Sequence, residues 1–497
     1  MSFLPTVLVA IPFVLFITLL FWRKLELVWV SLMALFISGT IAVFYWKIFP
    51  SFLIGSLEKG FFVALDIFFI ILGAIFFLEI LKKTKIIENI GIYLESISGD
   101  IRIQVILLAW FFENFLEGTA GFGTPGTVVA PLLIGLGITP LNAVILALLG
   151  NSTAGVFGAA GAPIKIGFGE IAGASLPMKA ALFNFAGILV PVFMLWLVTR
   201  GGGDKRRSFF EMLPFAIWSG VVFVVSSALT VFMGVEFPSI LGSAVGLIII
   251  LFTIKIGLFM PKNKQSLGSV RDTLATLSLK KTIFPYILLI AFLFVGKFVL
   301  GARGVPIPIA VKHTFTFFNP GFAFIFAGII VSIFYKVPKN TFSWSLKKAL
   351  VKSFKPFLVI VFMSSMAQIM VNSAQNFTGL PSMIGYLAAN IKNAFLPFWS
   401  PIIGALGSFL TGSVTISNLM FGNFMATAAK ELSFNVDTIL ALVVAGGAAG
   451  NMVALADILV AEAVVGLKNE ERRILKGVIL PCLIYVGLIG LIGLMVL

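Results

Sequence analysis

The stretch Glu117-Gly118-Thr119-Ala120-Gly121-Phe122-Gly123-Thr124-Pro125-Gly126-Thr127 interrupts a long apolar region of the chain. It contains four glycines, three threonines, one proline and one glutamate. A second break, Asn151-Ser152-Thr153-Ala154-Gly155, follows the next apolar run and precedes Gly158-Ala159-Ala160-Gly161-Ala162-Pro163-Ile164-Lys165. In lipid every backbone amide and carbonyl needs a partner, so such breaks persist only inside protein or beside water.

These breaks indicate a binding site rather than simple helix packing. Broken helices near the middle of a membrane present amides and carbonyls that bind an anion and its coupling cation. We therefore interpret residues 103–170 as half of a transport site. The alternative is that small residues only let helices pack closely. It explains single glycines, but it explains poorly a run that also holds threonines, a proline and a glutamate.

Composition places the chain in a membrane. Of its 497 residues, 60% are hydrophobic and only 11% are charged, whereas soluble domains carry about 25% charged residues. This predicts an all-α polytopic membrane protein with about 12 transmembrane helices. The net charge of +15 is typical of cytoplasmic loops in membrane proteins and does not indicate a nucleic-acid partner. With one cysteine, Cys482, and one histidine, His313, we expect no metal site, no cofactor and no enzyme activity.

Lysine and arginine clusters predict the orientation, because cytoplasmic loops carry an excess of both. Five clusters are expected in the cytoplasm: Lys82, Lys83, Lys85 and Arg102; Arg200, Lys205, Arg206 and Arg207; Lys255, Lys262, Lys264, Arg271, Lys280 and Lys281; Lys336, Lys339, Lys347, Lys348, Lys352 and Lys355; and Lys468, Arg472, Arg473 and Lys476. The turns at 234–238 and 301–319 lie between neighbouring clusters and are expected outside. Counting spans from the clusters places both the N-terminus and the C-terminus outside.

The chain repeats itself after 294 residues, since Ile145-Leu146-Ala147-Leu148 recurs at 439–442. The same shift pairs Gly118 with Gly412. The second copy has its own hydroxyl-rich break at 410–418 and a second break at 445–451. The span count starts the first copy outside and the second inside, which predicts an inverted repeat with a shared site near the membrane midplane.

This repeat divides the chain into five predicted parts. They are N-terminal spans (1–60), a first inverted repeat (61–198) with a re-entrant hairpin (103–137) and a broken helix (140–165), central spans and cytoplasmic loops (199–355), a second inverted repeat (356–467) with a hairpin (395–430) and a broken helix (436–465), and a C-terminal span (468–497). Four full spans per copy would satisfy the same topology count, so both descriptions stay open.

At these residues the sequence resembles the L-lactate permease family, which carries lactate, glycolate and related 2-hydroxy acids with protons. The motif Glu-Gly-x-Ala-Gly-Phe-Gly-Thr-Pro of that family is found at 117–125, and similar segments are found at 151–153, 158–164 and 409–418. The resemblance covers residues 60–490. It implies paired hairpins and elevator motion, and it implies that the chain can form a homodimer.

The chain departs from the family pattern at three places in the second copy. Val414 replaces an acidic residue, and Asn451 replaces a lysine. The segment Ala454-Leu455-Ala456-Asp457 replaces Ser-Pro-Gln-Ser. These positions bear on the exact substrate and on the coupling ion.

A monocarboxylate needs donors aimed at its two oxygens, which backbone amides at helix breaks, hydroxyls and side-chain amides supply. The candidate substrate-binding residues are Thr119, Gly121, Gly123, Thr124, Asn151, Ser152, Thr153, Lys165, Thr411, Gly412, Ser413, Thr415, Ser417 and Asn418. The alternative for the hydroxyls is a hydrogen bond to the preceding helical turn. Lys165 could pair with the substrate, could pair with Asp457, or could extend to the membrane interface.

Charged side chains within a membrane are costly and therefore indicate function. We expect Glu117, at the first hairpin tip, to carry the proton, because burial favours the neutral form of a carboxyl group. Its alternative role is to cap a helix. Glu113, one turn earlier, and Asp457, in the second copy, are further candidates for proton coupling.

Together these features predict a secondary transporter in the plasma membrane. We expect symport of a proton with L-lactate or a related 2-hydroxy monocarboxylate such as glycolate or D-lactate. Sodium coupling is the alternative, since unwound carbonyls at 151–155 and 446–450 could hold Na⁺. A remote alternative is an ion channel, because 119–123 resembles a potassium filter strand, but a filter needs four such strands around one axis.

Overall fold

The computed structural model describes residues 3–22, 25–121, 123, 125–200, 205–262, 265, 275–301, 303–389 and 395–496. Helices dominate, and the strands in these ranges are the antiparallel pair β1 (Gly304–Ile307) and β2 (His313–Thr316). Among the described residues, nine helices are long and apolar enough to cross a membrane, or ten if one bent pair is a single span. The all-α polytopic class is confirmed. A further apolar stretch forms a helix of only 15 residues, α15 (Pro320–Phe334).

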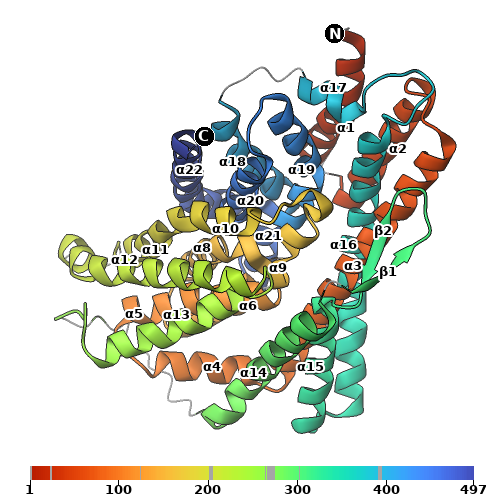
Figure 1. Ribbon diagram of the computed structural model, residues 1–497. Helices are drawn as coiled ribbons and strands as arrows, with labels where there is room; N and C mark the ends of the chain where they lie inside the picture. Colours follow the sequence, from red (N-terminus) through yellow and green to blue (C-terminus); the bar gives the residue numbers. More distant parts are fainter. Residues whose placement is uncertain are drawn as a thin grey trace.

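Two long helices form one side of the molecule (Figure 1). α3 (Pro50–Lys83) and α16 (Lys339–Asn372) have 34 residues each and pack along each other. At about 1.5 Å per residue, each is about 51 Å long and exceeds the ~30 Å hydrocarbon core of a bilayer. The other helices of this side are α1 (Phe3–Trp22), α2 (Leu27–Phe44), α15 and α17 (Met383–Ala389).

The first copy of the repeat consists of short helices separated at the predicted breaks. The hairpin stretch contains α5 (Ile101–Val105), a π-helical segment (Ile106–Phe112), α6 (Glu113–Thr119) and α7 (Gly126–Gly135). The following stretch contains α8 (Pro140–Gly150), a 3₁₀ segment (Thr153–Phe157) and α9 (Gly158–Lys165). The axis bends by 42° between α8 and the part that starts at Thr153. Within α9, Ala159, Ala160 and Gly161 have left-handed backbone conformations.

The second copy has longer helices in the same order. They are α18 (Leu396–Thr411), α19 (Val414–Glu431), α20 (Val436–Asn451) and α21 (Leu455–Val464), followed by the last helix, α22 (Glu471–Val496). α18 and α19 occupy the range predicted for the second hairpin, except that α19 ends one residue beyond it, and α20 and α21 lie within the range predicted for the second broken helix. The inverted relation between the copies and the re-entrant course of the hairpins stay predictions.

One predicted break was wrong in position. The glycine-rich stretch 446–451 was expected to interrupt the second crossing helix, but α20 is helical through Asn451. Its glycines instead permit close packing against α18. A Cβ atom on Gly446 would lie 2.0 Å from the Pro401 carbonyl oxygen, and one on Gly450 would lie 2.5 Å from the Ala405 Cα atom. The glycines therefore lie within α20, where they let its backbone pack against that of α18, and the helix ends after them.

The remaining elements complete the first copy and fill the chain between the two copies. They are α4 (Ile86–Glu95), a 3₁₀ turn (Gly169–Ile171), α10 (Leu176–Phe183), a 3₁₀ segment (Asn184–Leu189), α11 (Val190–Thr199), α12 (Lys205–Thr230), a 3₁₀ turn (Val231–Met233), α13 (Pro238–Lys255), α14 (Leu279–Val295) and a π-helical turn (Gly296–Leu300). The strand pair lies in the turn predicted outside at 301–319.

The crossing helices form the centre of the protein. Every residue from Ala143 to Gly150 and from Thr438 to Asn451 is buried. Figure 1 shows α8, α20 and α21 between the first hairpin and the C-terminal helices. The polar breaks at the ends of α8 and α20 are therefore enclosed by protein, which satisfies the requirement for interrupting a helix at membrane depth.

Candidate functional site

The two hairpin tips meet the broken helices of both copies. Gly121, Gly123 and Gly412 all have positive φ angles, which glycine adopts without steric cost. A Cβ atom on Gly123 would lie 2.0 Å from Oδ1 of Asp457, and one on Gly412 would lie 2.9 Å from the Ala456 Cβ atom. Glycine is therefore required there for two reasons, the turn and the close approach to α21.

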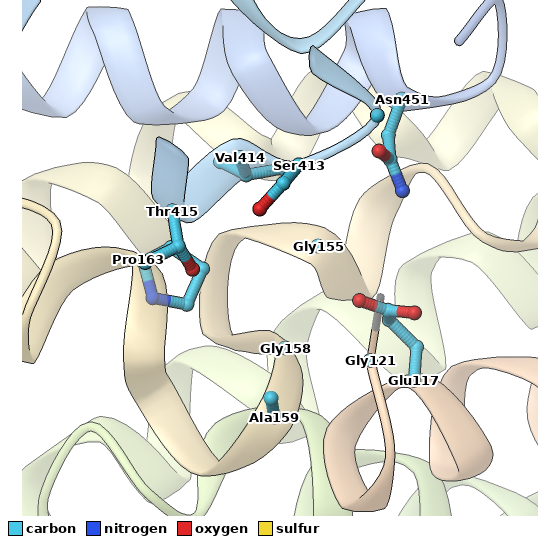
Figure 2. Close-up of a pocket in the computed structure, with 11 residues that line it drawn as sticks. Glu117, Gly121, Gly155, Gly158, Ala159, Pro163, Ser413, Val414, Thr415 and Asn451 are labelled. Carbon is cyan, nitrogen blue, oxygen red and sulfur yellow. The ribbon is translucent and has the colours of Figure 1, made fainter. Parts of the chain in front are cut away.

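A small cavity lies where these segments converge (Figure 2). It has a volume of about 20 Å³, which is room for about one water molecule. Its lining residues come from both copies: Glu117, Gly121, Gly155, Gly158, Ala159, Pro163, Gly412, Ser413, Val414, Thr415 and Asn451. The structure thus brings the breaks near 117–127, 151–165 and 410–418 together around one space.

Three carboxyl groups are buried in and beside this cavity. Glu113, Glu117 and Asp457 are each at most 6% exposed, and Glu113 interacts electrostatically with the other two. Both oxygens of Glu113, Oε2 of Glu117 and Oδ2 of Asp457 have no hydrogen-bond partner among the described residues. A buried carboxylate without a partner is costly, so these groups require a proton or a cation.

The cavity itself is acidic. Figure 2 shows the Glu117 carboxyl group and the Asn451 amide pointing toward each other across it. Of the described lining residues, none is a lysine or an arginine. The amide oxygen of Asn451 has no partner in the described part of the chain. Unpartnered polar atoms inside protein mark a place where a ligand supplies the missing contacts.

Four residues that the sequence analysis did not identify hold the first helix break in shape. The Ala154 amide donates to Asn114 Oδ1 at 3.0 Å, and Ser239 donates to the Ala154 carbonyl at 2.7 Å. Asn184 donates to the Thr153 carbonyl at 2.9 Å and accepts from the Tyr485 hydroxyl at 2.6 Å. Ser239 and Tyr485 come from α13 and α22, outside the repeat. Of these four residues, only Asn114 could have been suspected from the sequence, because it directly follows Glu113.

Several predicted substrate-binding hydroxyls bond to nearby backbone instead. Thr119 donates to the Leu116 carbonyl, and Ser152 donates to the Leu149 carbonyl. Thr411 and Ser417 also donate to carbonyl groups, at Gly407 and Gly404. The bonds of Thr119, Ser152 and Thr411 match the alternative of a hydrogen bond to the preceding helical turn. Ser417 instead bonds across to Gly404 in α18. Predicted residue Thr124 lies outside the described residues.

The other predicted residues are closer to the cavity. Gly121, Gly412, Ser413 and Thr415 line it. Asn418 lies behind the wall and donates to the Pro163 carbonyl at 2.9 Å. These contacts keep five predicted residues at or next to the space between the copies.

Two further predicted residues are buried in the first break. The amide oxygen of Asn151 has no partner in the ranges that the structure describes. Thr153 lies 3.4 Å from the Tyr485 hydroxyl, oxygen to oxygen. Neither residue is among those that line the cavity.

Lys165 lies elsewhere, and its suggested pairing with Asp457 is wrong. Its Nζ atom is 3.1 Å from Oε1 of Glu236, which also pairs with Lys297 at 3.2 Å. The same ammonium group lies 4.6 Å from the centre of the Phe318 ring. Glu236 is fully buried, so removing its cations would leave an uncompensated buried charge. No local pattern could have paired residues 71 positions apart.

Broken helices that meet inside the protein are typical of membrane transporters. The fold and the cavity place the chain in this class. The model of a protein family described as L-lactate permease matches residues 6–303 and 297–497 of the chain. The chain belongs to this family.

Relatives with this description span nearly the whole chain. A protein named L-lactate permease from Halalkalibacterium halodurans is 30% identical over 94% of this chain and 92% of its own length. A putative L-lactate permease from Haemophilus influenzae is 29% identical over 85% of each chain. The glycolate permease GlcA of Escherichia coli is 28% identical over 99% of this chain and 95% of its own length.

A solved structure also aligns with the chain. The YdaH transporter of Alcanivorax borkumensis, described as having an unusual topology, aligns with 86% of this chain and 84% of its own at 13% identity and a TM-score of 0.45.

Proposed function

We propose that the protein carries a small 2-hydroxy monocarboxylate across the plasma membrane together with a proton. L-lactate, D-lactate and glycolate are the candidate substrates. The membership in the L-lactate permease family and the relatives named for lactate and glycolate support this substrate class.

The observation that carries the proposal is the buried Glu117 carboxyl group, whose Oε2 atom has no partner among the described residues, in an acidic cavity between the copies. A carboxylate anion entering this space would be repelled by an ionised Glu117 and by Asp457. Protonation of Glu117 removes the part of that repulsion that Glu117 causes. Anion binding and proton binding would then each favour the other, which is the thermodynamic basis of symport.

The size of the cavity supports a transport cycle with moving hairpins. A space of about 20 Å³ holds about one water molecule and is too small for a 2-hydroxy acid. We infer that substrate binding separates the tips around Gly121 and Gly412. Alternating exposure of this space to the two sides would complete the cycle.

Sodium coupling is a second candidate. The unpartnered oxygens of Asn151, Asn451 and Glu117 are ligands of the type that hard cations prefer. A bound Na⁺ would neutralise the acidic cavity as a proton does. A transport assay distinguishes proton coupling from sodium coupling, because the gradient of each ion can be imposed separately.

Uptake of labelled L-lactate into proteoliposomes tests both candidates. An imposed inward pH gradient is compared with an imposed sodium gradient for wild type, Glu117→Gln and the control Glu431→Gln, whose side chain is exposed. We expect uptake driven by the pH gradient in wild type and in the control, and none in Glu117→Gln. Because glutamine resembles a protonated carboxyl group, Glu117→Gln should still exchange lactate between preloaded vesicles and medium.

Three results would change the proposal. Sodium-driven uptake that survives Glu117→Gln would assign coupling to Na⁺ and remove Glu117 as the carrier. Loss of both uptake and exchange in Glu117→Gln would assign the residue to substrate binding or folding. No uptake of L-lactate, D-lactate or glycolate by the wild type would reject the substrate class.

We also propose that both termini lie outside and that the protein forms a homodimer. The distribution of lysine and arginine supports the orientation. Protease accessibility of terminal tags in intact cells tests the orientation, and mass measurement in detergent tests the dimer.

A further inference from the structure

A second, much larger cavity lies beside the first. Its volume is about 690 Å³, within the range of small-molecule sites. Its walls come from α3, α9, α16, α19 and the β1–β2 turn, and Figure 1 shows the strand pair beside α3 and α16. Lys312 and Thr314 at its rim are exposed, whereas Phe168 and Phe318 deeper inside are buried. The cavity therefore runs from the surface toward the interior.

Only a short segment separates the two cavities. Pro163 lines the small cavity, and Lys165 to Gly167 line the large one. Asn418, which bonds to the Pro163 carbonyl, is followed directly by Leu419 in the wall of the large cavity. The large cavity opens on the side of the turn 301–319.

The large cavity carries an excess of positive charge. Lys59 pairs with Glu170 at 2.9 Å, and Asp66 lies 3.4 Å from Nε2 of His313. Lys312 has no ion-pair partner in the described ranges.

The floor adds an ion triad, because Lys165 and Lys297 share the single carboxylate of Glu236. Among the described lining residues, Lys59, Lys165 and Lys312 face Asp66 and Glu170, and the Glu236–Lys297 pair behind Lys165 adds no net charge. One net positive charge therefore remains without a partner, and it favours an anion over a cation.

The triad allows Lys165 to change partners. If its ammonium group turned to a ligand, Glu236 would keep the ion pair with Lys297. The buried carboxylate would thus never be left without a cation, which is the costly case for a buried ion pair. About 28% of the Lys165 side chain is already accessible. Amide groups of Gln368 and Asn372 in the same wall could bond to a hydroxyl of the ligand.

We propose that this cavity is the outer vestibule of the transport pathway and binds the substrate anion, a small monocarboxylate, through Lys165 and Lys312 before it enters the cavity at Glu117. The inference rests on the proposed function. Lys165 is then a ligand on the entry path rather than a residue of the small cavity.

Cysteine labelling tests the vestibule, since the chain contains a single cysteine, Cys482, and that residue is buried. In a Cys482→Ala background, Gln368→Cys probes the cavity wall and Gln375→Cys, in an exposed position outside the cavity, is the control. Each variant reacts from outside with an anionic and with a cationic thiosulfonate reagent. We expect the anionic reagent to react several-fold faster than the cationic one at position 368. At position 375 we expect the two reagents to react at similar rates.

Two additions make the test specific. L-lactate should slow the reaction at position 368 and leave the control unchanged. Adding Lys165→Gln or Lys312→Gln should remove the preference for the anionic reagent. Lys165→Arg should retain it, which separates a charge effect from a folding defect.

Transport kinetics give an independent measurement. Lys165→Gln should raise the KM for the substrate about tenfold, the order expected from losing one charge-assisted contact, with a smaller change in maximal rate. The exposed lysine variant Lys339→Gln is the matched control.

The outcomes separate this inference from the proposed function. The charge preference of the reagents requires no transported substrate, so it can be found even if lactate is not carried. Equal rates of both reagents at position 368, or rates that Lys165→Gln and Lys312→Gln leave unchanged, would overturn the vestibule while leaving lactate transport intact.

Discussion

At the scale of single residues, the acidic cluster is the feature that most restricts function. Glu113, Glu117 and Asp457 come from two copies of the repeat and lie close enough to interact. Their contacts leave oxygens without partners in the described part of the chain. Such an arrangement is stable only while protons or cations are present. Whether the site holds protons or cations therefore depends on the ions present on the side of the membrane to which the site is open.

The position of Glu117 depends on the glycine beside it. A Cβ atom on Gly158 would lie 2.4 Å from Oε1 of Glu117, so Gly158→Ala should displace the carboxyl group and lower uptake at least tenfold. Gly39→Ala is the control, because nothing lies within 4 Å of its added Cβ atom. Initial uptake rates at matched protein levels are the measurement. Equal rates in both variants would show that the position of this carboxyl group is unimportant.

At the scale of elements, hydrogen bonds from distant helices hold the first break. Asn184 both donates to the Thr153 carbonyl and accepts from Tyr485. The break therefore keeps its shape without a ligand, because its backbone groups have internal partners.

These contacts predict an order of stabilities. Asn184→Leu should lower the free energy of unfolding by about 1–3 kcal/mol, since it leaves the buried carbonyl of Thr153 and the Tyr485 hydroxyl without a partner. Tyr485→Phe should cost less, about 1 kcal/mol, because Asn184 keeps its bond to Thr153. Thermal unfolding in detergent measures both variants. A larger loss for Tyr485→Phe would contradict the assignment.

The elements also show what could be predicted from sequence. The interruptions after α6 and α18 and the first helix break were located because glycine, proline and hydroxyl residues interrupt apolar runs there. The second break was predicted in the wrong position because the glycines of α20 serve packing against α18. Composition alone does not distinguish glycines that interrupt a helix from glycines that let two helices pack closely. The partner of Lys165 and the role of Tyr485 depend on helices far away in sequence, so no local pattern carried them.

At the scale of the whole molecule, a buried ion cluster joins three distant parts of the chain. Arg102 pairs with Asp100 at 2.7 Å and with Glu211 at 3.4 Å. Asp100 also accepts from the Gln265 amide at 3.0 Å. The start of the first hairpin is thereby fixed to α12 and to the loop after α13.

Breaking this cluster should destabilise the protein strongly. Arg102→Gln leaves Asp100 buried without its cation, so we expect a loss of about 3–5 kcal/mol in the free energy of unfolding. The control is Lys355→Gln, which breaks an exposed ion pair with Glu26 and should cost about 0–1 kcal/mol. Melting temperature and yield of folded protein compare the two. Similar melting temperatures would show that the cluster contributes little.

The close packing of α18 on α20 limits how the protein can move. Each helix places a carbonyl group where a side chain on the other would lie: the Val443 carbonyl of α20 at Gly404, and the Pro401 carbonyl of α18 at Gly446. Two backbones in such contact cannot slide or rotate past each other without collision. We therefore expect α18 and α20 to move as one rigid unit, so that the hinges of the proposed transport motion lie outside the contact between these two helices.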